Sequence, residues 1–228
     1  MADRQLSFPE AVIFDMDGTL FQTETLLTVV HDRLFQQLRE EGLYTKETPP
    51  VDALLSCLGM LLKDIWFRVI PEGTPEVHQR ADELMLDLEL EEIAASRGNL
   101  YPHVPETLKA LKDRGIKLFV ASNGLQDYVE AIVLHRTIDK LFDGLYTAGG
   151  RSTATKVELV KILLEEHGIK SAWMVGDRSS DVEAGKGNGL QVVGCGYAAF
   201  GKPGELEGSD AIITDFRELL DLLPEQKV

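Results

Sequence analysis

The chain has 228 residues, of which 44% are hydrophobic and 27% charged, and its formal net charge is −15. This length allows one large domain or one domain with an insertion, and the composition is that of a globular protein. The acidic balance argues against a nucleic-acid partner, because a nucleic-acid surface needs basic patches that displace counterions from phosphates. A small anionic ligand is compatible with this balance where a cation or a lysine reverses the local field.

Neither export nor membrane insertion is predicted from the sequence. The first ten residues lack the apolar core of a signal peptide, and the richest apolar window, residues 54–62, is far shorter than the roughly 20 residues that cross a bilayer. The two cysteines, Cys57 and Cys195, form no CxxC pair and are expected to be reduced thiols. We therefore predict a cytoplasmic protein without a membrane partner, and the sequence has no signature of an oligomeric state.

The first predicted element is a buried strand at residues 11–14, a short apolar run bounded by polar residues. Residues 22–97 then contain no strand-like run, and their apolar side chains recur at helical spacing. We predict that residues 22–97 form a helical cap inserted after the first strand, and that residues 1–21 and 98–228 form the core. The acidic stretch 72–92 is interpreted as the solvated outer face of a cap helix.

Beyond the insertion, apolar runs rich in Val and Ile alternate with helical patterns. The runs lie at residues 116–121, 172–175, 190–194 and 211–214. Each run is typical of a strand buried on both faces, and two of the helical patterns end in Gly115 and Gly168, as helix C-termini often do. This alternation predicts an α/β fold with a doubly wound, parallel, Rossmann-like sheet.

Side chains that can do chemistry follow several of these predicted strands. In chain order they are Asp15 and Asp17, then Ser122, Asn123 and Gly124, and then Asp177, while Lys156 opens a helix before the strand predicted at residues 172–175. Ligands of open parallel sheets bind beyond the carboxyl ends of the strands. We therefore expect three carboxylates, a hydroxyl, an amide and an ammonium group to gather at one edge of the sheet.

Such a group of residues favours a metal ion and a phosphate. Clustered carboxylates repel one another unless a cation lies among them, and hard oxygen ligands favour Mg²⁺, which shares its coordination shell with waters and a phosphate. Ser122, the backbone N–H groups around Gly124 and the ammonium of Lys156 supply the donors and the charge that phosphate oxygens require. One of the paired aspartates can then bind the metal and attack phosphorus, while the other donates a proton to the leaving oxygen and activates water.

The segments DMDGT, SNG, a lone lysine and GDRSSD, in this order, resemble the four motifs of the haloacid dehalogenase-like hydrolase superfamily. The resemblance covers nearly the whole chain, and its nearest branch is that of phosphoglycolate phosphatase and β-phosphoglucomutase. It implies that Asp15 is the nucleophile that forms an aspartyl-phosphate and that Asp17 is the general acid and base. Ser122 and Lys156 would bind the transferring phosphoryl group.

The same resemblance implies the other members of the site. Asn123 and Gly124 would shape the phosphate loop. The metal site would comprise Asp15, the backbone carbonyl of Asp17, Asp177 and Asp181, the last of which would orient Lys156 or a metal-bound water. One departure is Gln22-Thr23-Glu24, where relatives often carry Asp-Ser-Glu. This position lies at the cap hinge and bears on substrate identity more than on reaction type.

We predict a Mg²⁺-dependent phosphatase that hydrolyses a small phosphorylated metabolite, a phosphate monoester, through an aspartyl-phosphate. Asp17 indicates phosphoester chemistry, since branches that resemble true dehalogenases lack this second aspartate. A sugar phosphomutase of the same superfamily and a non-catalytic phospho-acceptor switch are the alternatives. Phosphoglycolate, a sugar phosphate, pyrophosphate and a nucleoside monophosphate all fit the sequence. Lys63 and Arg68 are the candidate cap contacts to an anionic leaving group.

Overall fold

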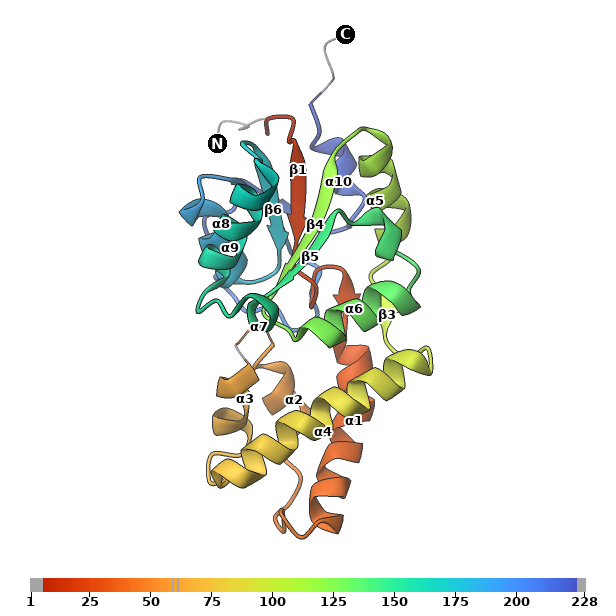
Figure 1. Ribbon diagram of the computed structural model, residues 1–228, viewed down its shortest axis with the longest axis vertical. Helices are drawn as coiled ribbons and strands as arrows, with labels where there is room; N and C mark the ends of the chain where they lie inside the picture. The colour runs from red at the N-terminus through yellow and green to blue at the C-terminus, as the bar shows by residue number, and fades with distance from the viewer. Residues whose placement is uncertain (1–5, 59, 61, 225–228) are drawn as a thin grey trace.

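The computed structural model describes residues 6–58, 60 and 62–224, and their core is a parallel β-sheet (Figure 1). The sheet has six strands in the order β5-β4-β1-β6-β7-β8. The strands are β1 (Ala11–Phe14), β4 (Lys117–Ser122), β5 (Gly144–Thr147), β6 (Ala172–Gly176), β7 (Gln191–Cys195) and β8 (Ala211–Ile213). Every neighbouring pair is parallel, which confirms the predicted α/β fold with a Rossmann-like sheet.

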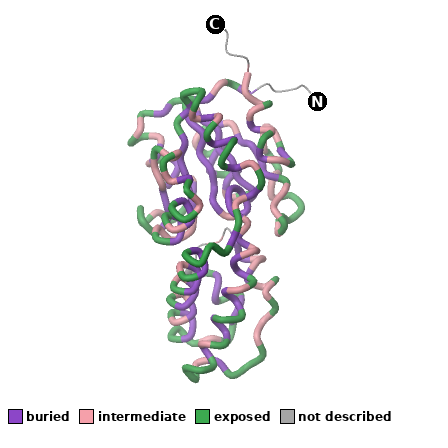
Figure 2. Tube along the Cα trace, turned by 90° about the vertical axis from the view of Figure 1, so that its right-hand side faces the viewer, coloured by how far each residue is buried: buried purple, intermediate pink, exposed green. Residues whose placement is uncertain are grey.

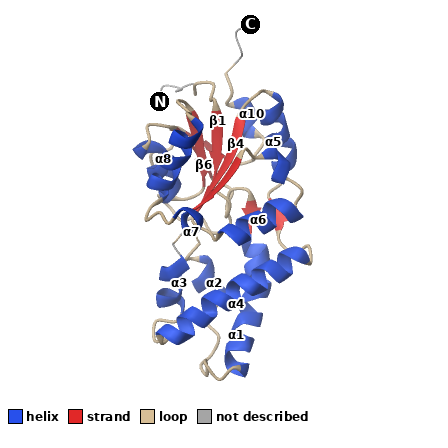
Figure 3. Cartoon of the chain, viewed as in Figure 1, coloured by secondary structure: helices blue, strands red, loops and turns tan. Residues whose placement is uncertain are grey.

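Helices cover both faces of this sheet because alternate residues of each strand point to opposite sides (Figure 3). On β1, Val12 and Phe14 belong to the apolar cluster that includes side chains of α5 and α6, whereas Ala11 and Ile13 belong to the cluster that includes side chains of α8 and α9. The helices of this part of the chain are α5 (Val104–Asp113), α6 (Gln126–His135), α7 (Ala148–Arg151), α8 (Lys156–His167), α9 (Ser179–Gly187) and α10 (Glu218–Asp221), with a 3₁₀ turn at Asp139–Leu141.

The register of the sheet brings the ends of its central strands level. Phe14, the last residue of β1, pairs with Val120 of β4 on one side and with Val175 of β6 on the other. The loops that follow β1, β4 and β6 therefore begin at the same edge of the sheet, which is the edge where ligands bind in parallel α/β sheets.

Residues 21–100, between β1 and the core helix α5, form a mostly helical part beyond that edge (Figure 1). Its elements are β2 (Phe21–Gln22), α1 (Thr23–Glu40), α2 (Val51–Leu55), α3 (Leu62–Val69), α4 (Pro75–Ala94) and β3 (Asn99–Leu100). The short strands β2 and β3 pair antiparallel, so the chain leaves and re-enters the core side by side. Helix α4 packs against both α1 and the core helix α6. The boundaries of a cap at residues 22–97 stay a prediction.

Burial follows the layers of the fold, with buried positions along the strands and on the inner helix faces (Figure 2). The interpretation of residues 72–92 as a solvated acidic face is wrong at Glu89 and Glu92, which expose only 8% and 4% of their surface. Glu92 is compensated by Arg33 of α1, whose Nη1 lies 2.5 Å from Glu92 Oε1, and by Arg97. Within the part of the chain that the structure describes, Glu89 has no such cation, and its surroundings are described below.

Two other sequence-based expectations concern membranes and cysteines. Among the helices of the described residues, none is long and apolar enough to cross a membrane. Cys57 and Cys195 are both buried and free, as expected of reduced thiols. Both sulfur atoms belong to residues of the large apolar cluster, so their role in the fold is packing.

Candidate active site

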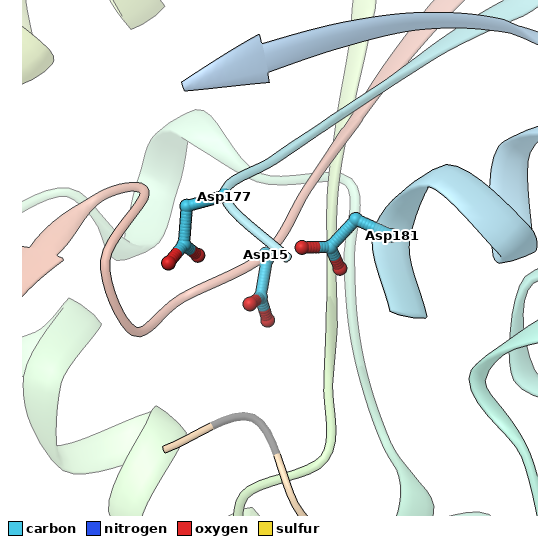
Figure 4. Close-up of side chains that lie close together, drawn as sticks. All are labelled: Asp15, Asp177 and Asp181. Carbon is cyan, nitrogen blue, oxygen red and sulfur yellow. The ribbon is translucent and has the colours of Figure 1, made fainter. Parts of the chain in front are cut away.

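Three carboxylates from separate parts of the sequence meet at the carboxyl edge of the sheet (Figure 4). Asp15 follows β1, Asp177 follows β6, and Asp181 lies in the first turn of α9. One oxygen atom from each of the three lies within 4.8 Å of the others. All three are buried, with exposed fractions of 3%, 1% and 0%. The sequence placed Asp15 and Asp177 at one edge and the resemblance added Asp181, and the structure brings all three within range of a single ion.

Two glycines allow the backbone to come this close to the carboxylates. Gly18 adopts a left-handed φ of +77°, and a Cβ atom there would lie 2.4 Å from Asp177 Oδ2. At Gly176, a Cβ atom would lie 2.2 Å from Cγ of Asp181. The turn around Gly18 is closed by a hydrogen bond of 2.9 Å from Phe21 N–H to the carbonyl oxygen of Met16. Side chains at either glycine would push the carboxylates apart.

Lys156 supplies a positive charge to this cluster. Thr155 caps the N-terminus of α8 by accepting from Glu158 N–H at 3.2 Å, which fixes Lys156 as the first residue of the helix. Its Nζ atom lies 2.8 Å from Asp15 Oδ1 and 2.7 Å from Asp181 Oδ1, and the side chain is almost fully buried. Burial lowers the pKa of Lys156, but attraction to both carboxylates outweighs that effect, so its pKa is raised and the ammonium stays charged.

Asp181 uses both of its oxygen atoms. While Oδ1 pairs with Lys156, Oδ2 accepts a hydrogen bond of 3.0 Å from the backbone N–H of Arg178. Burial raises the pKa of Asp181 to about 6, although the lysine opposes the shift. This carboxylate therefore orients Lys156 and closes the loop after β6.

Asp177 is the member of the cluster with an unused oxygen. Its Oδ1 accepts from Thr19 Oγ1 at 3.3 Å, whereas its buried Oδ2 has no hydrogen-bond partner in the described part of the chain. Burial, followed by repulsion from Asp181 and Asp15, raises the pKa of Asp177 well above its ordinary value. An orphaned carboxylate oxygen beside two further carboxylates fits a hard divalent cation, which prefers oxygen ligands and would relieve the repulsion.

Asp17 points to a different set of partners. Its Oδ1 accepts from Tyr128 Oη at 2.7 Å and from Thr23 Oγ1 at 2.5 Å. Burial raises the pKa of Asp17, and these two hydrogen bonds oppose the rise. Thr23 is the first residue of α1 and Tyr128 belongs to α6, so the Asp17 carboxyl group connects the loop after β1 to both parts of the molecule. Tyr128 was missed in the sequence, where an aromatic residue in an amphipathic helix indicates only core packing.

The loop after β4 completes the group of residues predicted from the sequence. The Oγ atom of Ser122 accepts a hydrogen bond of 3.0 Å from Gly124 N–H, which holds the loop in a tight turn. Ser122, Asn123 and Gly124 line one cavity of about 70 Å³ together with Asp15, Asp17 and Lys156. The structure thus brings the predicted nucleophile, acid, phosphate loop and lysine to a single cavity, with Asp177 and Asp181 beside Asp15.

The opposite wall of this cavity consists of residues that the sequence did not single out. They are Leu58, Met60, Ile65, Asp82, Met85, Leu86 and Glu89, from the helical part of the chain. Burial, followed by repulsion from Asp17, raises the pKa of Glu89 well above its ordinary value. Arg68, a predicted contact to the leaving group, is exposed on α3 and is not part of the described lining. The side chain of Lys63, the other candidate, lies outside the described residues.

Comparison with known proteins places this geometry in a family. Residues 12–195 match the family model described as haloacid dehalogenase-like hydrolase. The chain is 26% identical over 226 residues to a phosphoglycolate phosphatase of Pseudomonas putida, covering 94% of this chain and 79% of that protein. It is 27% identical to a 5′-nucleotidase of Pseudomonas aeruginosa, covering 90% of each.

Solved structures show the same fold. A predicted phosphoglycolate phosphatase from Haemophilus somnus superposes with a TM-score of 0.78 at 24% identity, covering 93% of this chain and 97% of that one. The motif residues that match this family are the ones that meet at the sheet edge. The chain therefore belongs to the haloacid dehalogenase-like hydrolase family, and it is an enzyme of the phosphatase kind.

Proposed function

We propose that the protein is a Mg²⁺-dependent phosphatase that hydrolyses a small phosphate monoester, with Asp15 as the nucleophile. The observation that carries this proposal is the ion pair of 2.8 Å between Lys156 Nζ and Asp15 Oδ1, beside the unpartnered Oδ2 of Asp177. A lysine alone would neutralise only part of this acidic cluster, so the arrangement suits a site completed by a divalent cation and a phosphate.

In the first half of the reaction, a carboxylate oxygen of Asp15 attacks phosphorus and the bond between phosphorus and the leaving oxygen breaks. Asp17 gives its proton to that oxygen, which departs as an alcohol. Ser122 and Lys156 hold the phosphoryl oxygens, whose charge changes during the transfer. When bound at Asp15, the Asp17 carbonyl and Asp177, Mg²⁺ would supply further positive charge for those oxygens.

In the second half, water attacks the phosphorus atom of the phosphoryl-Asp15 group. Asp17, now ionised, accepts a proton from this water, the bond from phosphorus to the Asp15 oxygen breaks, and inorganic phosphate leaves. Burial keeps the pKa of Asp17 raised, which supports its function as an acid, and the hydrogen bonds from Tyr128 and Thr23 keep the carboxyl group in place. Helices α1–α4 would act as the cap that limits access of bulk water.

Hydrolysis of p-nitrophenyl phosphate tests this function. We expect Mg²⁺-dependent release of phosphate, and a loss of at least about 10³-fold in kcat for Asp15→Asn, because the amide cannot form the covalent intermediate. Asp87→Asn is the control, since it changes the same charge at an exposed position of α4. Wild-type enzyme quenched during turnover should carry a phosphoryl group that hydroxylamine removes.

The outcomes separate the alternatives that the sequence left open. Full activity of Asp15→Asn would overturn the proposed mechanism. Slow labelling of Asp15 without release of phosphate would favour a phospho-acceptor switch. Transfer of the phosphoryl group to a second hydroxyl of a sugar phosphate, in place of release, would identify a mutase.

A further inference from the structure

One wall of the active-site cavity is a single face of helix α4. Asp82, Met85, Leu86 and Glu89 all line the cavity, and their spacing of three, four and seven residues places them on the same side of an α-helix. The opposite wall carries Asp15, Ser122 and Lys156, where the phosphoryl group would lie. The α4 face is therefore the surface that meets the leaving group.

The charges on this face are all of one sign. Glu89 exposes 8% of its surface and makes no hydrogen bond or ion pair with any residue that the structure describes. Asp82 lies one helical turn beyond Met85 and Leu86 on the same face and accepts a hydrogen bond from the indole N–H of Trp66. Within the described lining of the cavity, the cation is Lys156, and it is already paired with Asp15 and Asp181.

We propose that Glu89 and Asp82 select phosphate monoesters whose leaving group carries hydroxyl or ammonium donors, and that they reject leaving groups that carry a carboxylate. This inference rests on the phosphatase function proposed above and specifies its substrate class. Glu89 and Asp82 are specificity-determining residues here, whereas residues of the opposite wall carry out the phosphoryl transfer itself.

The physical basis is the cost of burying like charges together. A carboxylate on the leaving group would lose its hydration next to the carboxyl groups of Glu89 and Asp82, and the described α4 face offers it no positive charge. If Glu89 were protonated, it could donate one hydrogen bond to that carboxylate but would still supply no cation. A hydroxyl or ammonium group can donate to the same oxygens, and Met85 and Leu86 provide an apolar surface for its carbon atoms.

We call the proposed selection against an anionic leaving group the charge rule, and three compounds of nearly equal size test it. They are phosphoglycolate, ethylene glycol monophosphate and O-phosphoethanolamine, in which the group at the far end of a two-carbon leaving group is anionic, neutral and cationic. At pH 7.5 with Mg²⁺ we expect kcat/KM for each of the last two to exceed that for phosphoglycolate by at least about tenfold, as expected for one unscreened charge repulsion. Equal or faster turnover of phosphoglycolate would overturn the proposal.

Glu89→Gln identifies the residue responsible. This change replaces a carboxyl group that can ionise by an amide that cannot, at nearly constant volume, so kcat/KM for phosphoglycolate should rise relative to that for ethylene glycol monophosphate by about fivefold or more, while the preference for O-phosphoethanolamine should fall. Asp87→Asn, an exposed position on the same helix, should leave all three ratios as in the wild type. Unchanged ratios in Glu89→Gln would overturn the assignment of Glu89.

Failure of the charge rule and failure of the proposed function give different results. If wild-type enzyme hydrolyses p-nitrophenyl phosphate but treats the three compounds alike, the charge rule is wrong and the phosphatase function stands. If neither p-nitrophenyl phosphate nor any of the three compounds is hydrolysed with Mg²⁺, the phosphatase function fails, and the charge rule fails with it. Thermal melting of Glu89→Gln shows whether the variant is folded.

Discussion

Asp177 is a buried carboxyl group with an oxygen atom that nothing in the described chain satisfies. A buried oxygen atom without a partner lowers the stability of the fold unless a ligand binds to it. Burial and two neighbouring carboxylates also raise the pKa of Asp177 well above its ordinary value. Because the folded-state pKa is raised, ionised Asp177 destabilises the metal-free protein, and this destabilisation grows as pH rises above the ordinary aspartate range near 4.

The variant Asp177→Asn tests whether ionised Asp177 destabilises the metal-free protein. In EDTA at pH 7 we expect it to be more stable than the wild type by about 1–3 kcal/mol, because the substitution removes an uncompensated buried charge. With Mg²⁺ the order should reverse, since only the wild type gains stability from binding the ion. Chemical denaturation with and without EDTA measures both effects. A lower stability of Asp177→Asn in EDTA would contradict the expectation.

Asp82 shows the same effect at a position that is only half buried. Burial is the main cause that raises its pKa from 3.8 to about 6, while the hydrogen bond from Trp66 opposes the shift. Protonation is therefore favoured in the folded state, and the stabilisation by protonated Asp82 that is present below pH 4 is lost as pH rises through about 6.

Replacement of Asp82 by Asn removes this pH dependence. The stability difference between Asp82→Asn and wild type should shift in favour of the variant between pH 4 and pH 7, by about 1 kcal/mol after allowance for solvent screening. Urea unfolding at the two pH values measures the difference. A difference that stays constant, or moves in favour of the wild type, would show that the pKa of Asp82 is not raised in the folded state.

At the scale of the elements, the turn after β1 determines whether the site can assemble. Gly18 lies in this turn with φ of +77°, and the Asp177 carboxylate packs where its Cβ atom would be. Gly115, at the C-terminal end of α5, has a nearly equal φ of +78°, but a Cβ atom there would meet nothing within 4 Å. The two glycines share the backbone conformation and differ in what surrounds them.

Alanine substitutions at Gly18 and Gly115 separate the effect of backbone strain from the effect of displacing Asp177. Gly18→Ala and Gly115→Ala should each lose about 1 kcal/mol of stability, because a side chain disfavours the left-handed region. Gly18→Ala alone should also lose at least about 10²-fold in phosphatase activity, since displacement of Asp177, the proposed metal ligand, by an ångström or more would remove productive geometry. An active Gly18→Ala enzyme would show that the position of Asp177 is not critical.

At the scale of the whole molecule, the net charge of −15 opposes compaction. This net charge is what remains after all basic residues are counted, including Arg33 and Arg97, which flank the buried Glu92. Raising NaCl shortens the Debye length from about 30 Å at 0.01 M to about 8 Å at 0.15 M and so screens the remaining repulsion. We expect the melting temperature in EDTA to rise by a few degrees over this range, measured by calorimetry. A falling melting temperature would mean that specific ion pairs outweigh the general repulsion.

The sequence by itself determined five of the six strands of the sheet in chain order, with β5 missed, and the residues that follow the strand ends at the site. Apolar runs and glycine-terminated helical patterns are local signals, and a parallel sheet brings its strand ends to one edge whatever the loops do. This is why Asp15, Ser122, Lys156 and Asp177 could be assigned to one site from their places in the chain.

Only the tertiary structure decided which residues surround Asp17 and which residues form the far wall of the cavity. The hydrogen bond from Tyr128 to Asp17 and the face of α4 that lines the cavity depend on how α4 packs against α1 and α6. Helical periodicity indicates which residues share a face but not what that face meets, so Glu89 looked like one of several solvated acidic residues. The same limit applies to Arg68, which is exposed and is not part of the described cavity lining. The orientation of its side chain follows from the packing of distant segments, so the sequence could not show whether it faces the cavity or solvent.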